Sequence, residues 1–163
     1  MQKLIFVVRH AKSSWESPLK DLDRPLNDRG IRTAPIMAAL FKDLILGPTL
    51  VISSPANRAF STAKVFHAEC QLEEPIKVVN DLYFGDEESY LESIRKVADK
   101  FRTVALFGHN PKVEDFSARV VNGYTGNVPT CAIMSFISEV NEWKEVDWST
   151  IQYNKHYFPK ELE

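Results

Sequence analysis

The sequence has only two cysteines among its 163 residues, Cys70 and Cys131, and they lie far apart in unlike surroundings. Such a pair forms neither a disulfide framework nor a cluster with the spacing of metal ligands. Histidine pairs and carboxylate clusters at ligand spacing are missing as well. We therefore expect reduced, structural thiols, and we expect neither a metal nor a cofactor.

A basic surplus and long apolar runs are also missing. The formal net charge is -2 at pH 7, so no excess of lysine and arginine is available to neutralise the phosphates of a nucleic acid. The apolar stretch at residues 4–8 stops at Arg9, which makes it too short for a signal peptide or a membrane span. We expect a cytoplasmic protein with neither a nucleic-acid partner nor a membrane partner.

The residues that are present suit one folded unit. Apolar side chains make up 44% of the chain, which is enough for a single sizeable core. No repeat, low-complexity segment or linker divides the sequence. Residues 1–163 are therefore expected to form one domain.

Short apolar runs alternate with patterns of helical period along the chain. The runs expected as strands are residues 4–8, 49–54, 76–80, 103–109 and 132–138, with residues 143–148 pairing beside the last. The helices are expected from Asn27 to the Gly47-Pro48 pair, from the cap Ser54 through residue 69, over 87–100 and over 111–121. Strands that alternate with helices predict an α/β fold, a three-layer α/β/α sandwich around a mostly parallel sheet.

The first expected helix raises two questions of detail. Its core-facing stripe is expected to be Ile31, Ala34, Ala38, Phe41 and Ile45. Pro35 falls inside this stripe, and we expect it to kink the helix or to delay its start.

Polar residues with phosphate chemistry follow three of the predicted strands. The first strand ends at Arg9 and His10, the second leads to Arg58 in the next helix, and the fourth ends at His109 and Asn110. Ligands of parallel sheets bind at the carboxyl ends of the strands. Two arginines and a helix N-terminus make a site for a dianion. A histidine beside them can attack phosphorus while the second histidine stabilises charge on the phosphoryl oxygens, without a metal.

Four segments in this order resemble the histidine phosphatase superfamily, the phosphoglycerate mutase-like group. The segments are VVRHAKSSW at residues 7–15, DRPLNDRG at 23–30, SSPANRAFSTA at 53–63 and GHNP at 108–111. The alanine after the Arg-His pair, the KSSW that follows it and the short chain resemble the SixA-type phosphohistidine phosphatases. The likeness extends to YFPKEL at residues 157–162.

The resemblance implies a role for each matching residue. His10 is expected to be the nucleophile that becomes phosphorylated, and Arg9 and Arg58 are expected to bind the phosphoryl group. His109 is expected to donate a hydrogen bond to the phosphoryl group and to stabilise the transition state, and Asn110 to add a backbone N–H. The implied partner is a phosphorylated protein, such as a histidine-containing phosphotransfer domain.

The chain departs from the wider superfamily at two places. Glu16 stands where many members have an asparagine, and no carboxylate matches the acid that ester-cleaving members carry after the third strand. Glu87 is the candidate if a general acid exists. An alkoxide leaving group benefits from an acid by 10²–10⁴-fold, whereas a phosphorylated imidazole leaves more easily. This favours a phosphohistidine substrate.

Residues next to the motifs receive structural predictions. DRPLNDRG is expected to form the start of the first helix and an internal ion pair, and Lys12, Ser13 and Ser14 are candidates for the pocket mouth.

Two other functions stay open at this point. One is hydrolysis of small phosphate monoesters on the same fold, and the other is a phosphate-binding module without turnover.

Overall fold

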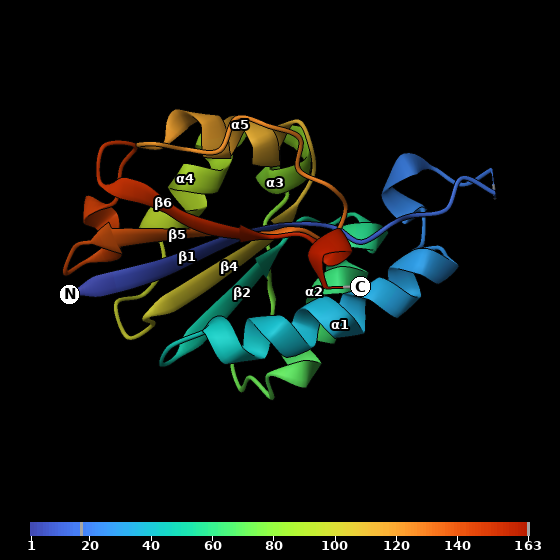
Figure 1. The fold of residues 1–163 in the computed structure, drawn as a ribbon, viewed down its shortest axis with the longest axis horizontal. Coiled ribbons are helices and arrows are strands. Elements are labelled where there is room, and N and C mark those ends of the chain that lie inside the picture. Colours follow the sequence, from blue (N-terminus) through green and yellow to red (C-terminus); the bar gives the residue numbers. More distant parts are fainter. Residues whose placement is uncertain (17, 163) are drawn as a thin grey trace.

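The computed structural model describes residues 1–16 and 18–162 and contains a six-stranded sheet between two layers of helices (Figure 1). The strands are β1 (Gln2–Arg9), β2 (Thr49–Ser53), β3 (Lys77–Val78), β4 (Thr103–Gly108), β5 (Ile133–Glu139) and β6 (Ile151–Tyr157). The helices are α1 (Asp28–Leu44), α2 (Asn57–Glu69), α3 (Asp81–Phe84), α4 (Glu87–Arg95) and α5 (Lys112–Arg119). Short 3₁₀ helices are η1 (Asp21–Asp23), η2 (Trp143–Glu145) and η3 (Pro159–Glu161).

The strand order is β3-β2-β4-β1-β5-β6, and only β5 runs against the others. The predicted three-layer α/β sandwich with a mostly parallel sheet is therefore confirmed. Chain connections from β1 lead to one side of the sheet and those from β4 lead to the other. This reversal opens a crevice at the carboxyl ends of β1 and β4, which is where such sheets bind ligands.

Strand β1 lies near the middle of the sheet and is buried on both faces. Its alternate residues Leu4, Phe6 and Val8 join the core beneath α1 and α2, whereas Ile5 and Val7 join the core beneath α4 and α5. A slip of one residue would exchange these two sets, and each buried side chain contributes about 1.5–3 kcal/mol. The apolar pattern therefore fixes where β1 ends.

The register of the sheet brings three strand ends to one place. Arg9 pairs with Gly108 across β1 and β4, so His10 and His109 leave the sheet side by side. Ser53 pairs with Phe107 of β4, so the residue after β2, Ser54, arrives at the same edge.

Helix α1 begins where it was predicted but differs from the prediction at Pro35 and in its buried face. The predicted cap is confirmed, because the Asn27 side chain accepts the Gly30 N–H at 2.9 Å. Pro35 does not delay the start, because it lies on the exposed side, where a missing backbone hydrogen bond is tolerated. Ile31 is 59% exposed, and Met37 takes a place in the core instead.

Several predicted boundaries are wrong. Helix α2 begins at Asn57 after an extended Ala56, not at residue 55, and α4 ends at Arg95 rather than residue 100. The third strand is only Lys77–Val78 at the exposed edge. The partner of β5 is β6 rather than residues 143–148, because Trp143 is fully buried and its indole donates to the Phe101 carbonyl at 2.8 Å.

Neither a membrane-crossing helix nor a group of three metal-ligating side chains is found in residues 1–16 and 18–162. The helices there are too short or too polar to span a bilayer. Histidine, cysteine, aspartate and glutamate side chains do not gather in a set that could hold a metal ion.

Candidate active site

A cavity of about 220 Å³ opens at the carboxyl ends of the central strands. Five of the predicted site residues line it, namely Arg9, His10, Arg58, His109 and Asn110. The predicted mouth residues Lys12 and Ser13 line it too, whereas Ser14 does not. The sequence prediction therefore brought the right strand ends to one pocket, which we call the catalytic pocket.

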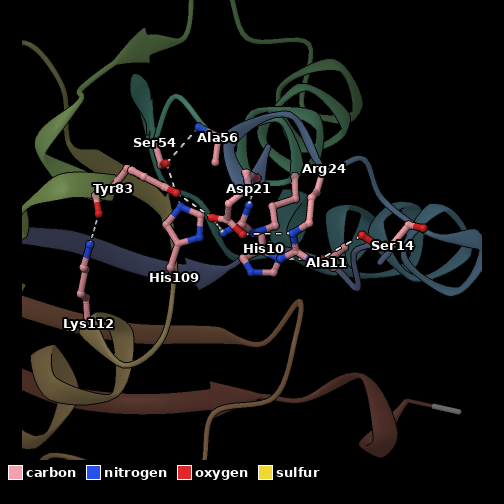
Figure 2. A network of polar contacts seen from close by, with 11 residues as sticks. His10, Ala11, Ser14, Asp21, Arg24, Ser54, Ala56, Tyr83, His109 and Lys112 are labelled. Carbon is pink, nitrogen blue, oxygen red and sulfur yellow. Dashed lines mark hydrogen bonds and ion pairs between the residues drawn. The ribbon is translucent and has the colours of Figure 1, made fainter. Parts of the chain in front are cut away.

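A contact with the backbone of Ala11 holds the ring of His10 in the catalytic pocket (Figure 2). The residue is 7% exposed, and Nδ1 lies 2.7 Å from the Ala11 carbonyl oxygen. A carbonyl only accepts hydrogen bonds, so Nδ1 carries the proton and Nε2 keeps its lone pair. Burial, together with the positive charges of Arg58 and Arg9, lowers the pKa of His10 to about 4. At neutral pH the ring is uncharged and Nε2 keeps a free lone pair, which is the state that a nucleophilic histidine requires.

The second histidine, His109, lies beside His10 with ring centroids 5.2 Å apart. Its Nε2 lies 2.8 Å from the Ser54 hydroxyl oxygen, which also accepts the Ala56 N–H. We assign the serine proton to the imidazole contact, which leaves the proton of His109 on Nδ1. That nitrogen is buried without a partner in the described structure. Burial lowers the pKa of His109 to about 3, and His10 adds to the effect.

Ser54 was predicted as a helix cap and not as a site residue. Its hydroxyl instead fixes the ring of His109, while the Tyr90 hydroxyl accepts the His109 backbone N–H at 3.2 Å. A Cβ at Gly108 would overlap that tyrosine hydroxyl, so glycine is required where β4 ends. The only sequence signal for Ser54 was its place at the end of a buried strand.

Two predicted arginines are fixed by backbone oxygens. Arg58 donates from Nη1 to the Asp21 carbonyl at 2.7 Å and from Nη2 to the Asp21 carboxylate at 3.0 Å. Arg9 donates from Nη1 to the Val128 carbonyl at 2.9 Å. The Val128 N–H in turn donates to the Glu114 carboxylate at 2.7 Å. These contacts hold both guanidinium groups against the catalytic pocket.

A third arginine, Arg24, lines the pocket and was missed as a site residue. It is 6% exposed, its guanidinium lies 3.4 Å from the ring centroid of Trp15, and its Nε donates to Asp21 at 3.1 Å. The ion pair predicted within DRPLNDRG is not found among the described residues, because Arg24 pairs instead with Asp21, which lies two residues before this segment. Asp21 binds both arginines and accepts the Tyr83 hydroxyl at 2.6 Å. The tyrosine hydrogen bond and Arg58 lower the pKa of Asp21 to about 2.

Glu87 lies outside the catalytic pocket, and this corrects its prediction as a general acid. It begins α4 and faces Arg119, with 3.7 Å between the carboxylate and the guanidinium. Within the described residues, no carboxylate lines the pocket. Asn110 does line it, and its Nδ2 donates to the Val128 carbonyl at 2.9 Å.

Comparison with known proteins agrees with this geometry. The family description that matches residues 5–124 is the histidine phosphatase superfamily, branch 1. An uncharacterized protein of Mycobacterium tuberculosis is 27% identical over 150 residues, which cover 86% of this chain and 92% of the relative.

Solved structures show the same fold over nearly the whole chain. The SixA protein of Agrobacterium tumefaciens has a TM-score of 0.76 at 25% identity, covering 95% of this chain and 97% of its own. The protein histidine phosphatase SixA complexed with tungstate has a TM-score of 0.80 at 24% identity over 100% of both chains. A mycobacterial glucosyl-3-phosphoglycerate phosphatase has a TM-score of 0.70 at 14% identity, covering 94% of this chain and 98% of its own.

Two histidines and three arginines at the ends of the central strands make a pocket suited to a phosphoryl group. The family match covers most of the chain, and the chain belongs to the histidine phosphatase superfamily. Membership supports a phosphatase that uses a catalytic histidine.

Proposed function

We propose that this protein removes the phosphoryl group from phosphohistidine on another protein, such as a histidine-containing phosphotransfer domain. The observation that carries the proposal is the state of His10, a neutral imidazole with Nδ1 bound to a carbonyl and Nε2 unprotonated in a pocket of arginines. A residue that only bound phosphate would not need a free lone pair. The arrangement favours turnover over a binding module.

The reaction proceeds in two displacements. The substrate ring takes a proton from solvent on its other nitrogen, Nε2 of His10 attacks phosphorus, and the bond from phosphorus to the substrate ring breaks, so the substrate leaves as neutral imidazole. Water then attacks the phosphorus on His10, which frees inorganic phosphate and restores the imidazole. No metal is needed in this scheme, because arginine side chains supply the positive charge.

Buried donors without partners support the binding of an oxyanion. Nε of Arg9, Nε of Arg58 and Nδ1 of His109 are buried and lack a hydrogen-bond partner among the described residues. Leaving a buried donor unpaired costs about 1–3 kcal/mol. A tetrahedral oxyanion in the pocket brings acceptor oxygens to these residues, and tungstate, which the similar SixA structure contains, has that shape.

The residues that line the catalytic pocket indicate which leaving group it can release. An alkoxide needs a proton as it departs, and a general acid typically contributes 10²–10⁴-fold. The catalytic pocket has no carboxylate among its described lining residues, and Asp21 is kept ionised by its tyrosine and arginine partners. Imidazole is far less basic than an alkoxide, so the site is better suited to P–N cleavage than to ester cleavage.

A substrate panel tests this function. Wild type and His10→Ala are compared on a phosphorylated histidine-containing phosphotransfer domain and on small phosphate monoesters. We expect the wild type to hydrolyse the phosphoprotein with the larger kcat/KM and His10→Ala to be inactive on both. Faster turnover of the monoesters would assign the enzyme to small-molecule phosphatases instead.

A further inference from the structure

A second cavity adjoins the catalytic pocket. It encloses about 240 Å³ between the first turns of α1, the loop before β5 and the C-terminal segment around η3. Lys12 and Thr130 line both cavities, so the two spaces meet along these residues. We call this second space the side cavity.

The side cavity is basic. Lys12, Arg29 and Lys160 line it, and all three side chains are exposed. None of them forms an ion pair with a carboxylate in the part of the chain that the structure describes. The nearby Glu161 is engaged elsewhere, because it accepts the Phe158 N–H and faces His156. The chain as a whole has a net charge of -2, so the positive charge around the side cavity is a local feature and does not reflect the overall composition.

An apolar wall completes the side cavity. Phe158 lines it together with Pro129 and Pro159. Phe158 stacks on the imidazole of His156 with 4.1 Å between ring centroids, which fixes its position. The segment around η3 also packs against α1. A ligand with a short aliphatic part and a terminal negative charge matches this combination of rings and cations.

We propose that the side cavity binds an acidic side chain that flanks the phosphorylated histidine of a polypeptide substrate. This inference rests on the proposed function, because it requires the phosphoryl group to occupy the catalytic pocket next to it. The methylene groups of the flanking glutamate contact Phe158, and its carboxylate contacts Arg29 and Lys160. The side cavity thereby distinguishes acidic substrates from neutral ones.

A pair of peptides tests the inference. Both contain one phosphohistidine, and the two residues on each side of it are glutamate in one peptide and glutamine in the other. Exposed ion pairs contribute about 0.2–1 kcal/mol each, so two of them predict a preference of about fivefold in kcat/KM for the glutamate peptide. In the double variant Arg29→Gln/Lys160→Gln, we expect this preference to disappear, with the glutamine peptide hydrolysed at the wild-type rate.

Arg32→Gln is the matched control, because Arg32 is an exposed arginine of α1 that does not line the side cavity. It should keep the wild-type preference. Equal rates on both peptides in the wild type, or a preference retained by the double variant, would overturn the inference. If the wild type hydrolyses the phosphotransfer domain but neither peptide, the inference fails alone; if it hydrolyses neither the domain nor the peptides, the proposed function fails as well.

Discussion

The two buried histidines of the catalytic pocket make folding stability depend on pH. In an unfolded chain a histidine binds a proton near pH 6.5, whereas in the folded protein the pKa is about 4 for His10 and about 3 for His109. Below pH 6.5 the unfolded state therefore binds more protons than the folded state. Their contribution to stability is fully present above pH 6.5 and is lost progressively as the pH falls toward the folded pKa values.

The magnitude follows from these pKa values. Between pH 7 and pH 5, protonation of one such histidine in the unfolded chain lowers the free energy of unfolding by about 2 kcal/mol, so the pair lowers it by about 4 kcal/mol. His10→Gln should reduce the loss to about 2 kcal/mol, and His10→Gln/His109→Gln should remove this part altogether. Both residues are at most 7% exposed, so solvent screens the effect little.

Urea unfolding at the two pH values measures this loss, with tryptophan fluorescence as the signal, since the chain has three tryptophans. When the change in the free energy of unfolding is compared between wild type and variant, the contributions of all other titratable groups cancel because both proteins share them. If His10→Gln loses as much stability between pH 7 and pH 5 as the wild type does, His10 is not a buried neutral imidazole. The basis for its nucleophilicity would then be refuted.

Three further substitutions test the supports of the catalytic pocket. Ser54→Ala removes the hydroxyl that orients His109, and we expect kcat for phosphohistidine hydrolysis to fall about tenfold, the effect of losing about 1.4 kcal/mol. Asp21→Asn weakens the anchor of Arg58, and tungstate affinity measured by calorimetry should fall by about tenfold. Gly108→Ala pushes a methyl group into the Tyr90 hydroxyl, and urea unfolding should show that the free energy of unfolding falls by about 1–3 kcal/mol.

Each of these outcomes has a matched control. Ser54→Thr keeps the hydroxyl and should retain more activity than Ser54→Ala, and equal activity would show that the hydroxyl does not position the imidazole. Asp21→Glu keeps the charge, so an affinity as low as that of Asp21→Asn would show that shape rather than charge anchors the arginine. Unchanged stability of Gly108→Ala would mean that the backbone there moves freely.

The sequence predicts best what depends on local apolar patterns. The central strands and the ends that carry His10 and His109 were predicted because their residues are apolar on both faces and stop abruptly at polar residues. Ser54 was misassigned because its partner lies 55 residues away, and only the register of β2 against β4 brings the two together. Arg24 was missed because its side chain points into the pocket only through the fold of the loop between β1 and α1 and its ion pair with Asp21. The last strand was misplaced because Trp143 is aromatic like a strand residue, yet packs as part of the core.

The position of the phosphoryl group on the trapped enzyme tests the central claim most directly. Brief reaction with a phosphohistidine protein, alkaline quenching and phosphorus NMR of the digested enzyme distinguish the two ring nitrogens of a phosphorylated histidine. Because Nδ1 of His10 donates to the Ala11 carbonyl, the account predicts phosphate on Nε2 of His10. Phosphate on Nδ1, on His109 or on no residue of the enzyme would contradict it.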